Sequence, residues 1–325
     1  MINIIDGITE FIIPEGAADY TDIKYMQYLE NLTINSGVSG QLSNISSLSQ
    51  LTTLHITNTS VSADELKIIG SLPKLQRLTL SGCGLSTVAG LESAAGLNYL
   101  NLSKNTVRNI SPLSSMKDLQ EADLQHNALT DLSALSSCTS LITLNVSNNS
   151  IKTLSPVCGI SSLTKLSADH NVITQLGNVG QITSLTELTV SYNQLTDISQ
   201  LASSTAIKSL DISNNQITDI SILAELMSLT HLNFSYNQVL ELPSFATDCV
   251  LIEINGAHNL LTSLDKLSGL KNLNTVYMDY NTEISSVKSL TDCPVLILVS
   301  VYGTKVTEIS RLTDQSIIVH YNPTQ

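Results

Sequence analysis

Large side chains are scarce in this sequence. Among its 325 residues there is no Trp, aromatic residues make up 4% and charged residues 13%, although 42% are hydrophobic. So few large side chains cannot form the centre of a conventional core. The composition therefore predicts a regular, layered core built from Leu and Ile.

Basic charge and long apolar runs are also missing. The net charge is −13 and no run of Lys or Arg occurs, so we expect no nucleic-acid partner. No apolar stretch approaches the roughly 18–20 residues of a membrane helix, so we expect no membrane insertion. Residues 1–16 lack the charged region and cleavage site of a signal peptide. The chain is thus either cytosolic or a mature fragment with an added start Met.

Catalytic and metal-binding motifs are absent as well. The sequence has no G-x-S-x-G elbow, phosphate-binding loop or H-E-x-x-H motif, so we expect no enzyme, no catalytic residues and no cofactor. Five cysteines are an odd number, and none forms a C-x-x-C pair. We therefore expect free thiols, with a Cys138–Cys158 bridge as the alternative. The cysteines are Cys83, Cys138, Cys158, Cys249 and Cys293.

What the sequence does contain is a repeat of the form L-x-x-L-x-L-x-x-N-x-L. Its spacing is 22 residues, apart from one interval of 24 and one of 23. Such a period is the signature of a leucine-rich repeat. About 13 copies begin at Leu29, Leu51, Leu75, Leu97, Leu119, Leu141, Leu163, Leu185, Ile207, Leu229, Leu251, Leu273 and Leu296.

Each copy divides into two halves with different periods. The L-x-L alternation in the first half predicts a strand with one apolar face. Apolar residues recur every third position in the second half, which favours a 3₁₀ turn, with Ser and Asp such as Asp197 and Ser199 as caps. The pattern predicts an α/β solenoid, a leucine-rich-repeat horseshoe with a parallel concave sheet and a convex side of 3₁₀ and short helical segments.

An Asn recurs at the ninth position of the repeat. We interpret it as a structural ladder, because a buried amide needs partners and the backbone of adjoining coils can provide them. The ladder is broken near the ends, at Gly37, Thr59, Cys83 and Thr304. Its members are Asn105, Asn127, Asn149, Asn171, Asn193, Asn215, Asn237, Asn259 and Asn281.

The ends of the chain depart from the repeat. We predict an N-terminal cap at residues 1–28, with a short helix at 14–20 that has Pro14 in its first turn. The array follows at 29–315, and a last strand or cap at 316–325. The single 24-residue copy predicts a longer helical segment at 62–72.

Copies such as LTELTVSYNQLTDISQL (185–201) and IKSLDISNNQITDISIL (207–223) resemble the repeats of bacterial internalins. This resemblance implies a secreted or cell-surface protein that binds a partner on its concave face. We expect this chain to differ from that family in having neither the immunoglobulin-like domain nor the sorting motif that usually follow the repeats. The same period is similar to that of phosphatase regulatory subunits, which are intracellular scaffolds.

One outward column points to a binding face. The residue just before the ladder position is His or Tyr in six of the nine copies from Lys104 to Tyr280. Exposed Tyr suits a partner interface, while stacking between coils is the alternative interpretation. We expect no metal site, because His126 and His170 lie two coils, about 10 Å, apart, which is too far for one ion without a further ligand such as Asp169. The predicted partner-binding residues are His126, His170, Tyr192, Tyr236, His258, Tyr277, Tyr280, Asp169, Glu187, Asp211 and Asp279.

Together these observations predict a monomeric, adhesin-like protein-binding module at the cell surface or secreted as a mature fragment. Its ligand is a protein, with a glycan as an alternative. The second hypothesis is an intracellular scaffold or regulatory subunit, favoured by free cysteines and by the lack of a signal peptide. The genomic start of the full-length chain would separate the two.

Overall fold

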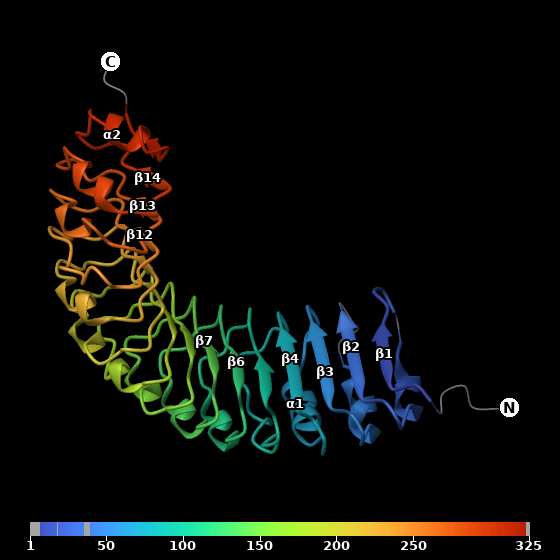
Figure 1. The fold of residues 1–325 in the computed structure, drawn as a ribbon. Helices are drawn as coiled ribbons and strands as arrows, with labels where there is room; N and C mark the ends of the chain where they lie inside the picture. Colours follow the sequence, from blue (N-terminus) through green and yellow to red (C-terminus); the bar gives the residue numbers. More distant parts are fainter. Residues whose placement is uncertain (1–6, 18, 36–39, 323–325) are drawn as a thin grey trace. The chain divides into compact units, whose positions relative to one another are not determined.

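The computed structural model describes residues 7–17, 19–35 and 40–322. They form two compact units, residues 1–152 with 159–163 and residues 153–158 with 164–325. Each unit is a stack of coils, and every coil contributes one short strand to a parallel sheet. Figure 1 shows the strands of each unit side by side, with the short helices on the opposite side of the coils.

In the first unit the strands pair in chain order. They are β1 (Glu10–Ile13), β2 (Asn31–Asn35), β3 (Thr53–Thr57), β4 (Arg77–Ser81), β5 (Tyr99–Asn101), β6 (Glu121–Asp123) and β7 (Thr143–Asn145). The other elements are 3₁₀ helices η1 (Thr21–Tyr25), η2 (Leu42–Ser47), η3 (Ser111–Ser115) and η4 (Ser133–Ser137), and the α-helix α1 (Ala63–Gly70).

The second unit repeats this plan, again with strands paired in chain order. Its strands are β8 (Lys165–Ser167), β9 (Glu187–Thr189), β10 (Ser209–Asp211), β11 (His231–Asn233), β12 (Glu253–Asn255), β13 (Thr275–Tyr277), β14 (Leu298–Ser300) and β15 (Ile318–His320). Its short helices are η5 (Ser155–Val157), η6 (Val179–Gln181), η7 (Ser199–Leu201), η8 (Ser221–Glu225), η9 (Asp265–Leu267), η10 (Lys288–Asp292) and α2 (Ser310–Thr313).

The predicted halves of the repeat are therefore confirmed as strand and 3₁₀ helix. Asp197 accepts the N–H of Ser199, the first residue of η7, at 2.8 Å, and Asp219 does the same for Ser221 of η8. These backbone hydrogen bonds hold the pKa of both carboxyls below the usual range. The acidic side chains thus satisfy N–H groups that the short helices leave unpaired.

The core is as regular as the sequence. In the copy that begins at residue 207, all the apolar repeat positions are buried, namely Ile207, Leu210, Ile212, Ile217, Ile220, Leu223 and Leu226. The largest fully buried side chain, Phe234, is matched by a glycine in the next coil. A Cβ on Gly256 would lie 2.3 Å from the Phe234 ring, so only glycine leaves room for it.

The Asn ladder joins each coil to the one before it. Asn215 Oδ1 accepts the N–H of Leu195 at 3.0 Å, and its Nδ2 donates to the carbonyl of Val190, also at 3.0 Å. Nδ2 also contacts the carbonyls of Ile212 and Ser213 in its own coil. Asn105, Asn127, Asn149, Asn193, Asn237, Asn259 and Asn281 make the same set of contacts to the preceding coil.

Smaller polar groups replace Asn near the ends of the array. The thiol of Cys83 lies 3.5 Å from the carbonyls of Ile56 and Ser81, and is fully buried. Thr59 and Thr304 donate to carbonyls of their own coils. Gly37 lies outside the described residues.

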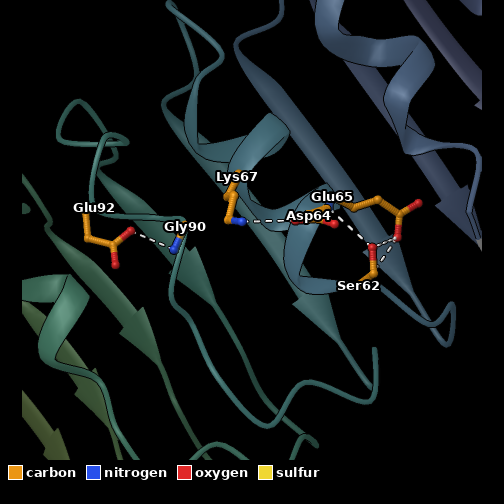
Figure 2. Close-up of polar contacts among 6 residues, drawn as sticks. All are labelled: Ser62, Asp64, Glu65, Lys67, Gly90 and Glu92. Carbon is orange, nitrogen blue, oxygen red and sulfur yellow. Dashed lines mark hydrogen bonds and ion pairs between the residues drawn. The ribbon is translucent and has the colours of Figure 1, made fainter.

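The 24-residue copy contains α1, as predicted. Ser62 and Glu65 form a reciprocal capping box at its start, in which the N–H of Ser62 donates to Glu65 Oε2 at 2.8 Å (Figure 2). Glu65 is buried and its Oε1 also accepts the N–H of Leu42. Burial, reinforced by the charge of Glu65, raises the pKa of Tyr20 to about 12.

Two glycines let α1 approach the next coil closely. A Cβ on Gly70 would lie only 2.0 Å from the Gly90 carbonyl oxygen, and one on Gly90 would lie 2.9 Å from the Lys67 nitrogen. Gly90 has φ of +109° and donates its N–H to Glu92 at 2.6 Å (Figure 2). The extra two residues of this copy are thus accommodated by glycine on both sides of the contact.

The chain ends follow the plan of the repeat. β1 pairs in parallel with β2, and η1 takes the place of the 3₁₀ segment, so the described residues from Glu10 to Tyr25 form a coil of the same kind. The helix predicted at 14–20 is wrong, because the described residues of this segment form a turn and the helical residues begin at Thr21. At the other end, β15 confirms the predicted last strand. No helix in the described part is long and apolar enough to cross a membrane.

We predict that Asn215→Ala lowers the free energy of unfolding by about 1–3 kcal/mol, because it leaves buried backbone groups of two coils without partners. Urea unfolding followed by circular dichroism measures this change. The neighbouring exposed Gln216→Ala is the control and should change stability by less than about 0.5 kcal/mol. Equal losses for the two variants would contradict the role of the ladder.

The five cysteines give a second prediction, since all are free and buried. Burial raises the pKa of Cys83, Cys138 and Cys158 to about 11. At about pH 8 roughly one such thiol in a thousand is ionised. A disulfide reagent should therefore modify fewer than about one thiol per native chain, and all five thiols once the chain is unfolded. Rapid labelling of the native chain would show that the coils open.

Candidate functional site

The solvent side of the sheet in the second unit carries two columns of side chains. The middle residue of every strand is wholly or largely buried, so the first and third residues face outward. Register pairs these residues from strand to strand. The first column is Lys165, Glu187, Ser209, His231, Glu253, Thr275, Leu298 and Ile318, and the second is Ser167, Thr189, Asp211, Asn233, Asn255, Tyr277, Ser300 and His320.

The structure divides the predicted partner-binding residues between two places. Glu187, Asp211 and Tyr277 lie on the sheet, and Asp169 and Asp279 follow β8 and β13 by two residues. The His and Tyr residues lie beyond the strands, in the turn that leads to the ladder Asn. We name this second set in the second unit the ridge, and it consists of His170, Tyr192, Tyr236, His258 and Tyr280. His126 has the same place in a coil of the first unit.

The ridge residues have left-handed backbone conformations, which the sequence reasoning missed. Their φ angles lie between +52° and +57°, where a bulky side chain is rarely found. The same column holds Asn58, Asn148 and Asn214, also at positive φ, and Gly82 and Gly303. Asn and Gly tolerate this conformation best, so their recurrence in the column was the available signal.

The ridge side chains stack on one another between coils. The rings of His170 and Tyr192 are nearly parallel, and their centroids lie 4.2 Å apart. His258 lies between Tyr236 at 4.1 Å and Tyr280 at 4.3 Å. The tyrosines nevertheless remain 45–51% exposed. Stacking therefore occurs, and it leaves about half of each tyrosine open to solvent.

The acidic residues have internal partners. Asp169 accepts the N–H and hydroxyl of Ser191, each at 2.8 Å, and Asp211 accepts the N–H of Ser213. Asp279 accepts the hydroxyl of Ser300 and the N–H of Tyr302, both at 2.6 Å. These contacts give the carboxylates a structural role that the sequence does not reveal.

Glu187 differs from these aspartates. It forms a 2.7 Å ion pair with Lys165 on the neighbouring strand, and both side chains are substantially exposed. An exposed pair of this kind adds little stability and can exchange for contacts with a partner.

Other large side chains of the second unit are also exposed, and two leucines among them were missed. Leu240 lies three residues after Asn237 and Leu260 one residue after Asn259, and they are 56% and 53% exposed. Tyr302 is 50% exposed and contacts the Tyr280 ring edge-on. Among the described residues, no group of three or more His, Cys, Asp and Glu lies close enough together to hold a metal ion.

Comparison with known proteins identifies the repeat. The family model for leucine-rich repeats in two copies matches residues 117–159 and 205–247, and a single-repeat model matches 181–198. The chain is a leucine-rich-repeat solenoid. A comparison with curated protein sequences found no match.

Several solved leucine-rich-repeat structures are similar to this solenoid. An internalin from Listeria monocytogenes (inlF) is 26% identical with a TM-score of 0.78, over 99% of this chain and 88% of the internalin. A leucine-rich-repeat protein of Leptospira interrogans is 22% identical with a TM-score of 0.83, over 95% and 80% of the two chains. The plant peptide hormone receptor RGFR1 in complex with RGF2 is 16% identical with a TM-score of 0.65, over 97% and 65%.

We predict that Tyr236→Asn changes the free energy of unfolding by less than about 1 kcal/mol. It loses one stacked contact but relieves the left-handed strain, and the two effects have similar size. Tyr236→Val is the matched control, because it also removes the ring but places a β-branched residue at positive φ. It should be less stable than Tyr236→Asn by about 1–2 kcal/mol in urea unfolding. Equal stabilities would show that the backbone does not limit this position.

Proposed function

We propose that this solenoid is a protein-binding module that binds its partner along the ridge and the adjoining sheet face of the second unit. The observation that carries the proposal is the left-handed conformation of exposed Tyr residues. Tyr192, Tyr236 and Tyr280 occupy positions where Asn or Gly would cost less, as Asn214 does between them. Backbone strain that is retained at exposed positions is typical of functional sites.

The chemistry of this surface suits a protein partner. Tyr combines apolar area with a hydrogen-bonding tip and loses little conformational entropy on binding. His258 has a ring stacked on each face, whereas Tyr192 and Tyr236 each have one stacked face and one face without a stacked ring. The apolar rings with their hydroxyl groups suit a protein ligand, with a glycan as the alternative.

We further propose that the partner is met at the cell surface or after secretion, in an adhesin-like role. Support comes from the resemblance to the Listeria internalin over nearly the whole chain. Five free, buried thiols favour the second candidate, an intracellular scaffold, because a reducing compartment preserves thiols. Cell fractionation of the native organism, with and without protease treatment of whole cells, separates these two locations.

The binding proposal is tested by changing three ridge tyrosines together. We expect Tyr192→Ala, Tyr236→Ala and Tyr280→Ala in one chain to weaken partner binding at least about a hundredfold, because each buried aromatic anchor is worth about 1–2 kcal/mol or more. Partners are captured with the wild-type chain from surface-protein extracts and measured by surface plasmon resonance.

A matched triple variant on the 3₁₀ side is the control. Thr205→Ala, Glu225→Ala and Met227→Ala remove exposed side chains of the same unit near η7 and η8. This variant should bind like the wild type. The proposal is wrong if the control loses binding while the tyrosine variant keeps it.

A further inference from the structure

The ridge has one missing ring. His170 and Tyr192 stack on one side of Asn214, and Tyr236, His258 and Tyr280 stack on the other. Asn214 occupies the same position of the repeat, at φ of +54°, but its amide reaches no further from the backbone than the first three ring carbons of a tyrosine. One face of Tyr192 and one face of Tyr236 therefore have no stacked ring between them.

The width of this interruption matches one planar group. Tyr192 and Tyr236 are two coils apart, which places their rings about 8–10 Å from each other by strand spacing. A flat group in van der Waals contact with both rings needs about 7–8 Å. Within the ridge, each coil already advances the stack by 4.1–4.3 Å between ring centroids. A single inserted plane would continue the stack without moving the backbone.

Exposure is slightly larger beside the interruption. Tyr192 and Tyr236, with one stacked ring each, are 51% and 50% exposed, and Tyr280, which contacts both His258 and Tyr302, is 45% exposed. Asn214 is half-buried and donates to Ser213 Oγ at 3.4 Å. Its amide oxygen can accept a hydrogen bond from a group that enters between the rings.

The negative charge of the surroundings favours a planar group that is also a cation. Three acidic residues lie on strands near Asn214, namely Asp211 in the same coil, Glu187 on β9 and Glu253 on β12. Glu187 is paired with Lys165, so Asp211 and Glu253 contribute most of the negative charge here. The electron-rich faces of two tyrosines add to this negative field. A cation that is also flat satisfies both conditions, and the arginine guanidinium is the protein group with these properties.

We propose that the space between Tyr192 and Tyr236, above Asn214, is a slot for the guanidinium group of an arginine on the partner protein. The ridge then binds one arginine by stacking its guanidinium group between two tyrosine rings, with Asn214 as a hydrogen-bond acceptor at the base. This inference rests on the proposed function, because it names the chemistry of the partner for the same surface. Lysine carries the charge without the plane, and an aromatic side chain has the plane without the charge.

The slot can be closed by one substitution that the repeat already tolerates. Asn214→His places a ring at a position where His126, His170 and His258 occur, at the same backbone conformation. It should complete the stack and raise the melting temperature, which also shows that the variant folds. Asn214→Gly keeps the slot open and suits the positive φ, so it is the matched control.

The probe is N-acetyl-arginine methylamide, with the corresponding lysine and tryptophan amides for comparison. In nuclear magnetic resonance titrations, we expect the arginine amide to shift the ring signals of Tyr192 and Tyr236 but not those of Tyr280. The lysine and tryptophan amides should bind about tenfold more weakly. Asn214→His should abolish the shifts and Asn214→Gly should retain them. Equal responses to the three amides, or an unchanged response in Asn214→His, would overturn the slot.

A captured partner separates this inference from the binding proposal. If Asn214→His keeps the affinity that the triple tyrosine variant loses, the ridge binds the partner and the slot is wrong. If neither variant loses affinity, the binding proposal itself fails. A loss in both, with retention in Asn214→Gly and loss on changing a partner arginine to lysine, supports the slot.

Discussion

The hydrogen bonds of the ladder Asn are the interaction on which the rest of this solenoid depends. Each coil must leave the sheet and turn, and at that point strand pairing no longer satisfies the backbone. The buried amide of Asn215 fills this need, since it bonds a carbonyl and an N–H of the preceding coil and two carbonyls of its own. A planar amide does this in a single residue, with its oxygen as the acceptor and two N–H donors, one of which is shared between two carbonyls. Cys83 and Thr304, which lack the full amide, supply fewer contacts.

The same turn determines the surface. Because the ladder Asn must point inward, the residue before it turns outward at positive φ, in both units. Side chains at this position are held in line from one coil to the next, and aromatic rings there stack at about the coil spacing. The structural requirement and the proposed binding ridge are therefore adjacent consequences of one backbone turn. Asn215 and Asn214 illustrate this, since neighbouring residues of one type take opposite roles.

The sheet face has less freedom than its polar composition indicates. Asp169, Asp211 and Asp279 accept hydrogen bonds from nearby backbone N–H groups. The side-chain oxygens of Asn233 and Asn255 likewise accept the N–H of the residue two positions later in the chain. Much of the negative charge on this side thus stabilises turns at the ends of strands. The similarity to the Listeria internalin supports the fold and the repeat. The ridge is inferred from the side chains of this protein alone.

The sequence by itself determined the coil. The 22-residue period, the alternation in the strands, the three-residue spacing of the 3₁₀ segments and the inward Asn could all be read from it, because buried positions in a repeat are constrained in every copy. The N-terminal segment at 14–20 was predicted wrongly, since Pro14 and polar residues indicate a helix start while pairing with β2 imposes the repeat's own turn. Only the tertiary structure decided how residues 22 apart meet. The stacking of His258 between two tyrosines, the internal bonds of the aspartates and the space above Asn214 depend on distances between coils, which a sequence pattern does not contain.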